Sequence, residues 1–137
     1  MAVSKNQIEK PYYELVFVVL VYRNIDVLRQ FFSTLTLSFS YRVIVVNSFF
    51  NQETEEACRA LSKEYDADFI PVPNKGFGAG NNSGCQYVMD HYQYRYLILS
   101  NSDIIIRDIT CLSQVEEQKA VYAADVRMEN GHRQNPH

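Results

Sequence analysis

Residues 15–22 form an unbroken apolar run rich in valine, and this run restricts the possible folds more than any other feature. A strand with one face in water alternates apolar and polar residues, whereas this run does not alternate. It therefore predicts a strand buried on both faces, as in the interior of parallel sheets. Residues 42–46 contain a second strand of this kind.

Helix-forming segments alternate with these strands. After the first strand, apolar residues recur at the spacing of one helical face, which predicts a helix over about residues 27–38, capped by Asn24 or Asp26. A second helix is expected to begin near Asn51. Further strands are expected at residues 68–72, 94–99 and 120–126, and further helices at about residues 80–92 and 108–118.

Strands that alternate with helices of this length form βαβ units around a mostly parallel sheet. Right-handed crossovers then place helices on both faces. The predicted fold class is therefore α/β, a Rossmann-like three-layer α/β/α arrangement. In such sheets ligands bind beyond the carboxyl ends of the strands, so the loops at that edge are the candidates for a site.

The bulk properties exclude several classes of protein. The chain has 137 residues and a formal net charge of −3, which fits one globular domain and argues against nucleic-acid binding. The first ten residues lack the apolar core of a signal peptide, and no apolar run reaches the ~20 residues that span a bilayer. We therefore expect a cytoplasmic protein. The three cysteines are expected to be reduced and mostly buried, with no structural zinc: Cys58, Cys85 and Cys111.

Residues 74–84 are rich in glycine and asparagine and lie between a predicted strand and a predicted helix. Glycines in this position allow close backbone approach, so that successive amides can bind a pyrophosphate. Asn81 and Asn82 add side-chain amides that can donate to phosphate, ribose or base. The alternative is a flexible turn with a glycine that packs a helix. The Gly-x-Gly-x-Gly spacing, after the third strand, disfavours a nicotinamide-dinucleotide site.

Polar residues also follow the other strands at the same edge. Asp103, next to a phosphate-binding loop, is well placed to hold Mg²⁺ or Mn²⁺ that bridges a diphosphate; the alternative is a turn or cap residue. Asn47 could read a base or ribose, or close an Asx turn. Tyr22 could stack on a base, or be part of the core or its rim. The sequence shows no Ser/His/Asp or Cys/His arrangement of the kind used in covalent catalysis. His91 is expected to be a surface or helix-end residue, and the tyrosines of residues 87–96 are expected to pack against the core.

At these loops the sequence resembles the family 2 glycosyltransferases with the GT-A fold, especially the rhamnosyltransferase-like branch. The resemblance rests on residues 21–24, 46–48, 74–84 and 101–103, and covers about residues 14–127. It implies an inverting hexosyltransferase that uses a nucleotide-diphosphate sugar, such as a dTDP- or UDP-sugar, with Mg²⁺ or Mn²⁺. It also implies a glycan or lipid-linked acceptor and a role in cell-surface polysaccharide synthesis.

Several site residues are carried over by this resemblance. Asn47 stands where many relatives have an Asp that contacts the base or ribose, Asn82 matches an asparagine that faces the nucleotide, and Asp103 matches the metal-binding acid. Asn101 replaces the first Asp of the strongest metal motif, and Ser102 stands where proline is usual. The residues expected to bind the nucleotide sugar are Tyr22, Asn24, Asn47, Gly76, Gly78, Asn81, Asn82, Asn101 and Asp103.

The expected organisation is an N-terminal extension at residues 1–12, a donor-binding domain at residues 13–127 and a polar tail at residues 128–137. The catalytic base of the family lies further along the chain, so we expect this portion to bind donor without efficient transfer. Missing downstream elements could expose apolar surface and promote a homodimer, and the full-length protein could lie at the inner face of the plasma membrane. The alternatives are a non-catalytic nucleotide-binding module and a dinucleotide-dependent oxidoreductase.

Overall fold

The computed structural model describes residues 9–107, 109, 112, 121–122 and 127–132. The chain divides into two units, residues 1–107 and 108–137. In the second unit, a tight turn is closed by the hydrogen bond that the Met128 amide donates to the His132 carbonyl oxygen, at 2.8 Å. The helix expected at 108–118 and the strand expected at 120–126 lie largely outside the described residues.

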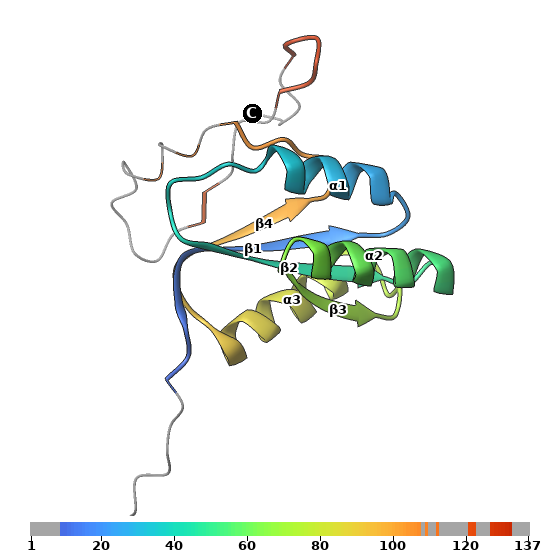
Figure 1. Cartoon of the computed structure of the whole chain (residues 1–137), viewed down its shortest axis with the longest axis horizontal. Coiled ribbons are helices and arrows are strands. Elements are labelled where there is room, and N and C mark those ends of the chain that lie inside the picture. The colour runs from blue at the N-terminus through green and yellow to red at the C-terminus, as the bar shows by residue number, and fades with distance from the viewer. Residues whose placement is uncertain (1–8, 108, 110–111, 113–120, 123–126, 133–137) are drawn as a thin grey trace, which may run out of the picture. The chain divides into compact units, whose positions relative to one another are not determined.

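The first unit is an α/β sandwich in which strands and helices alternate along the chain (Figure 1). All four strands are parallel, in the order β3-β2-β1-β4. The predicted α/β class with a parallel sheet is confirmed. The elements are β1 (Tyr12–Val21), α1 (Ile25–Thr34), β2 (Tyr41–Ser48), α2 (Gln52–Glu64), β3 (Asp68–Val72), α3 (Phe77–His91) and β4 (Gln93–Asn101).

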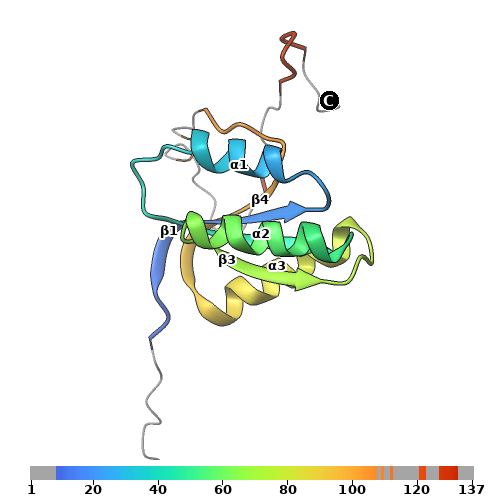
Figure 2. The same cartoon turned by 45° about the vertical axis from the view of Figure 1, so that its right-hand side comes forward.

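The two central strands, β1 and β2, are buried on both faces, as the continuous apolar runs predicted. Helices α1 and α2 cover one face of the sheet and α3 covers the other (Figures 1 and 2). On the first face, Phe17 of β1 meets Phe31 of α1 edge to face, with ring centroids 6.3 Å apart. On the second face, Val16 and Val18 form a buried cluster with Val88 of α3.

Two glycines allow α3 to lie unusually close to the sheet. A Cβ atom on Gly84 would lie 2.4 Å from Cγ1 of Val18 and 2.9 Å from Cγ2 of Val46. A Cβ atom on Gly80 would lie 2.6 Å from Cδ1 of Leu20. These distances are shorter than carbon–carbon contact distances. A Cβ atom at Gly80 could be accommodated by a shift of the flexible Leu20 side chain, whereas at Gly84 two branched valines would have to give way.

The helix boundaries differ from the expectation at two places. Helix α3 begins at Phe77, three residues before the expected start, because the amide of Gly80 already bonds to the Gly76 carbonyl oxygen at 3.2 Å. Gly78 and Gly80 are therefore helical and not part of an open loop. Helix α1 ends at Thr34, before the expected Ser38, where Leu35 leaves the helical conformation with ψ 106°.

A network of charged and phenolic groups ties β2 and β3 to the end of α3. The Arg42 guanidinium bonds to Asp68 and also donates to the Tyr92 hydroxyl at 3.3 Å, while the hydroxyls of Tyr92 and Tyr87 donate to Asp68. Burial alone would raise the pKa of Asp68, but the hydrogen bonds from Tyr92 and Arg42 hold it below its ordinary value. Burial and the bond to Asp68 raise the pKa of Tyr92 to about 12. The packing role predicted for Tyr87 and Tyr92 is confirmed.

Two further expectations concern the cysteines and membrane-spanning helices. Cys58 is a free, buried thiol, and burial raises its pKa to about 12, while Cys85 is half-buried and free. Cys111 lies outside the described residues. Within the part of the chain that the structure describes, every helix is too short or too polar to cross a membrane.

Candidate functional site

The order of the strands creates a switch point at the carboxyl edge of the sheet. From β1 the chain proceeds to β2 and β3 on one side, and then crosses to β4 on the other side of β1. Helices α1 and α2 therefore lie on one face and α3 on the opposite face. In open parallel sheets, loops that leave neighbouring strands toward opposite faces open a crevice, and ligands bind there. The candidate site is therefore at the carboxyl end of β1 and β4.

Three segments that are distant in sequence meet at this end. Leu20 of β1 is the register partner of Asn101, the last residue of β4. The side chain of Leu20 also lies directly beneath Gly80 in the first part of α3. Asp103 follows Asn101 by two residues and is exposed in the turn after β4. The glycine-rich segment and the residues 101–103 are thus brought to the same edge, as the sequence predicted.

The N-terminus of α3 lacks the capping groups that the other helices have. Asn24 caps α1 by accepting bonds from the amides of Asp26 and Val27, at 3.1 and 3.4 Å, and Asn51 caps α2 through the amide of Thr54. Gly76 occupies the corresponding position in α3 with φ 97° and provides no side-chain bond. The first turn of α3 has no acidic residue either. Its free amides and the positive end of its dipole are therefore available to an anion.

Two asparagines at this edge are buried with an unpartnered oxygen. Asn47, near the end of β2, is 1% exposed, and its Nδ2 donates to the Val21 carbonyl oxygen at 3.2 Å. Asn81, in α3, is 8% exposed. Among the described residues, the Oδ1 atom of each finds no hydrogen-bond partner, although such a buried acceptor costs about 1–3 kcal/mol. Each acceptor would be satisfied by a hydroxyl or N–H donor.

An aromatic platform stands at the end of β1. The rings of Tyr22 and Phe50 meet edge to face with centroids 5.4 Å apart, and both are exposed. The guanidinium carbon of Arg23 lies 5.4 Å from the Tyr22 centroid and 5.6 Å from that of Phe50. Tyr22 was predicted as a site residue, but Arg23 and Phe50 were not. Two consecutive phenylalanines directly after a strand, where the loop should turn polar, were the signal that could have indicated Phe50.

Other predicted residues have more ordinary positions. Asn24 caps α1, so its side-chain oxygen is already occupied. Gly78 has free space around its Cα, whereas Gly80 and Gly84 serve the packing of α3. Asn82 is exposed on the surface of α3. Only part of residues 74–84 is therefore placed to contact a ligand.

The described residues contain no group of three or more His, Cys, Asp or Glu side chains that could hold a metal ion by themselves. Asp103 and Asn101 can offer one carboxylate and one amide oxygen, which suits Mg²⁺ or Mn²⁺ only together with substrate phosphates. No model of a known protein family matches the chain, and no curated protein is significantly similar to it.

Proposed function

We propose that this chain is the donor-binding part of an inverting glycosyltransferase and binds a nucleotide-diphosphate sugar at the carboxyl edge of its sheet. The observation that carries the proposal is the uncapped N-terminus of α3 at the switch point between β1 and β4. A diphosphate is the group best suited to several free backbone amides and an unneutralised helix dipole. The resemblance in the sequence supplies the reaction class.

The surrounding residues suit the other parts of such a donor. The exposed ring of Tyr22 offers a surface for the base. The unpartnered Oδ1 atoms of Asn47 and Asn81 suit the N–H of a base or the hydroxyls of a ribose. Lys75, exposed directly before Gly76, adds a positive charge near the phosphates.

The residues also fit a divalent ion that is shared with the substrate. Asp103 and Asn101 would hold Mg²⁺ or Mn²⁺ together with the diphosphate oxygens. When bound there, such an ion offsets the charge of the departing nucleoside diphosphate. The chain's own contribution is to orient the diphosphate on the amides at the N-terminus of α3. The base that activates an acceptor is not assigned to any residue of this chain.

Calorimetry with UDP, dTDP and NAD, each with and without Mn²⁺, tests the proposal. We expect saturable binding of UDP or dTDP that strengthens with Mn²⁺, because Asp103 alone is a weak ligand for the ion. Binding of NAD alone would indicate a dinucleotide-dependent oxidoreductase instead. A nucleoside diphosphate that binds equally well with and without Mn²⁺ would contradict the role of the metal but not that of α3.

Two variants test whether Asp103 causes the Mn²⁺ dependence of nucleotide binding. Asp103→Asn removes the carboxylate with little change of shape, and we expect it to abolish the Mn²⁺-dependent gain in affinity. Asp90→Asn is the matched control, since Asp90 is also exposed but lies near the far end of α3. If Asp103→Asn leaves the Mn²⁺ dependence intact, Asp103 does not belong to the site.

A further inference from the structure

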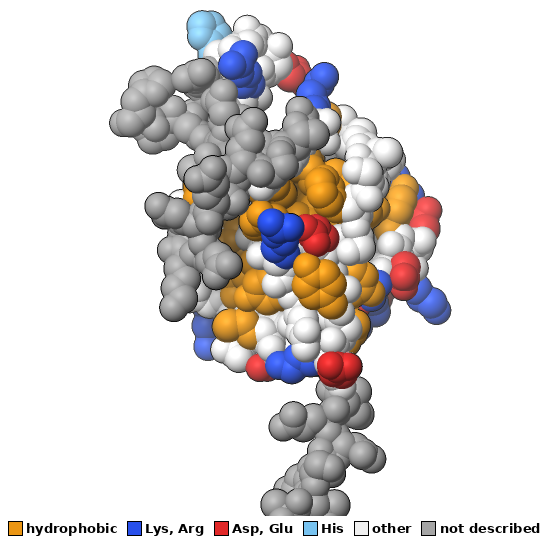
Figure 3. Space-filling model, turned by 90° about the vertical axis from the view of Figure 1, so that its left-hand side faces the viewer, with side chains coloured by type: hydrophobic (Ala, Val, Ile, Leu, Met, Phe, Trp, Pro, Cys, Tyr) orange, Lys and Arg blue, Asp and Glu red, His pale blue; other side chains and the backbone are white. Residues whose placement is uncertain are grey.

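A pocket lies at the amino edge of the sheet, opposite to the proposed nucleotide site. We name it the aromatic pocket; its volume is about 230 Å³. Sites for drug-sized ligands measure about 300–1,000 Å³, so this pocket suits a small head group rather than a nucleotide. Apolar side chains gather on the corresponding face of the molecule (Figure 3). Its aromatic and charged lining residues are Tyr13, Phe32, Tyr41, Arg42, Tyr65 and Asp66.

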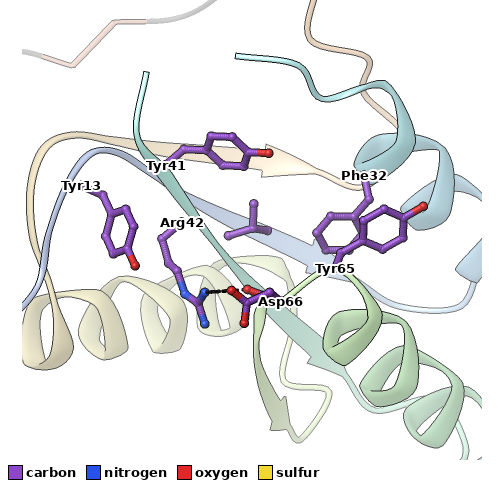
Figure 4. Close-up of a pocket in the computed structure, with 7 residues that line it drawn as sticks. Tyr13, Phe32, Tyr41, Arg42, Tyr65 and Asp66 are labelled. Carbon is purple, nitrogen blue, oxygen red and sulfur yellow. Dashed lines mark hydrogen bonds and ion pairs between the residues drawn. The ribbon is translucent and has the colours of Figure 1, made fainter. Parts of the chain in front are cut away.

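The walls of the aromatic pocket are rings supplied by separate elements. Tyr13 lies on one side of Arg42, and the stacked pair of Phe32 and Tyr65 lies on the other, with Tyr41 along the rim (Figure 4). The Phe32 and Tyr65 rings are nearly parallel, with centroids 4.7 Å apart. Tyr13 packs edge to face on Tyr92, and Tyr41 on Phe17. The rings are thus held by the core before any ligand arrives.

One guanidinium at the pocket is shared by two carboxylates. Arg42 is the one cation among the described lining residues, and its guanidinium is bound to Asp68, whose side chain is only 13% exposed. Asp66 is a second carboxylate 3.2 Å from the same guanidinium, and its side chain is 95% exposed. The ion cluster of Arg42, Asp66 and Asp68 therefore has one positive and two negative groups, although Asp68 itself does not line the pocket. Of the two carboxylates, that of Asp66 is the accessible one.

Asp66 is also fixed in position. Its backbone is left-handed, with φ 54°, a conformation that glycine, asparagine and aspartate adopt more readily than other residues. Its carbonyl oxygen accepts a 2.6 Å bond from Nη1 of Arg42, and its amide donates to the Lys63 carbonyl oxygen at 3.2 Å. The backbone of Asp66 is therefore held in place at the pocket, and its carboxylate pairs with Arg42.

Aromatic faces carry partial negative charge, and rings combined with a carboxylate are the chemistry that recognises organic cations. We propose that the aromatic pocket binds the alkylammonium head of a small organic cation, a group of the size and charge of trimethylammonium. An anion is disfavoured, because the donors of Arg42 are directed to carboxylates and Asp66 would repel it. A neutral apolar group would gain nothing from the Asp66 carboxylate, which lies at the pocket and pairs with Arg42.

Choline is the probe for this proposal, and 3,3-dimethylbutan-1-ol is its uncharged isostere with carbon in place of nitrogen. Titration of the full chain, followed by NMR, is expected to show saturable choline binding with a dissociation constant on the order of millimolar, and at least about fivefold weaker binding of the isostere. Equal affinity for the two compounds, or no saturable shift with choline at high millimolar concentration, overturns the proposal.

Two matched variants place the effect on named residues. Asp66→Asn keeps the left-handed backbone accessible and removes only the charge, so we expect roughly three- to tenfold weaker choline binding and unchanged binding of the isostere. Tyr41→Leu is expected to weaken choline, whereas Tyr12→Leu, at an exposed tyrosine of the same edge that does not line the pocket, is not. Choline affinity that is unaffected by Asp66→Asn contradicts the proposal. UDP is expected to bind independently of choline.

Discussion

Substitution of Gly84 by alanine tests how closely α3 lies against the sheet. Alanine is a better helix former than glycine by about 1 kcal/mol, so propensity alone predicts a gain in stability. The new Cβ atom, however, would lie 2.4 Å from Val18 and 2.9 Å from Val46, two buried side chains in central strands. Branching at Cβ restricts the χ1 angle of valine, and overpacking of this kind costs about 1–3 kcal/mol. With two stiff neighbours the upper half of that range applies, and the net loss is about 1–2 kcal/mol.

Gly78→Ala is the matched control, because a Cβ atom added at Gly78, in the same helix, would meet no side chain or neighbouring element within 4 Å. We expect it to raise the free energy of unfolding by about 0.4–1 kcal/mol. Urea unfolding followed by circular dichroism measures both variants. Gly84→Ala should lower the midpoint by roughly 0.5–1 M without a change of slope, for a slope of ~1–3 kcal/mol/M. A Gly84→Ala variant as stable as Gly78→Ala would refute the close packing of α3.

Three other predictions concern single side chains. Asp68 has a lowered pKa, so its contribution to stability is present above its unfolded pKa of about 3.9 and is lost as pH falls through the lower folded value. Asp68→Asn should therefore lower the free energy of unfolding by about 2–3 kcal/mol at pH 7 and flatten the acid side of a stability–pH curve. An unchanged acid side would show that Asp68 is not its cause. Tyr92 has a pKa raised to about 12, so its contribution is present below about 10 and is lost as pH rises through 12; Tyr92→Phe should flatten this alkaline limb in thermal melts. Asn24→Ala should lower the free energy of unfolding by about 1 kcal/mol through loss of the α1 cap, with Asp26→Ala as the milder control, and equal effects would contradict the capping role.

The reactivity of the cysteines belongs to the same set. Cys58 should resist alkylation at pH 8 in the native protein while Cys85 reacts first, because burial raises the pKa of Cys58 to about 12; peptide mass spectrometry reads each cysteine separately, and faster labelling of Cys58 would contradict its burial.

The central strands could be predicted from sequence because burial on both faces imposes a pattern that few other structures share. The runs at β1 and β2 are continuous in apolar residues, and β3 was predicted with its observed bounds, Asp68–Val72. The ends of the helices depend on single capping bonds. Asn24 and Asn51 gave such signals, but Gly76 provides no side chain, so the start of α3 could not be placed from sequence.

The location of the candidate site at the carboxyl edge of the sheet could be predicted from sequence, but the contacts of its individual residues could not. Parallel strands end at one edge, so Tyr22, Asn47 and Asp103 had to lie at the same edge of the sheet once the fold was known. Which glycines serve packing could not be predicted, because Gly80 and Gly84 are distinguished from Gly78 only by the strand residues beneath them. The network around Asp68 was missed for the same reason: Arg42 and Asp68 are 26 residues apart and meet only across neighbouring strands.

The most direct test of nucleotide binding at α3 uses the backbone amides of the glycines. The chain has five glycines, whose amide signals form a small, separate group in a ¹H–¹⁵N NMR spectrum. On titration with UDP and Mg²⁺, we expect the signals of Gly76 and Gly78 to shift with the same saturation as calorimetric binding. Saturable binding of UDP that leaves Gly76 and Gly78 unshifted would show that the N-terminus of α3 does not hold the diphosphate.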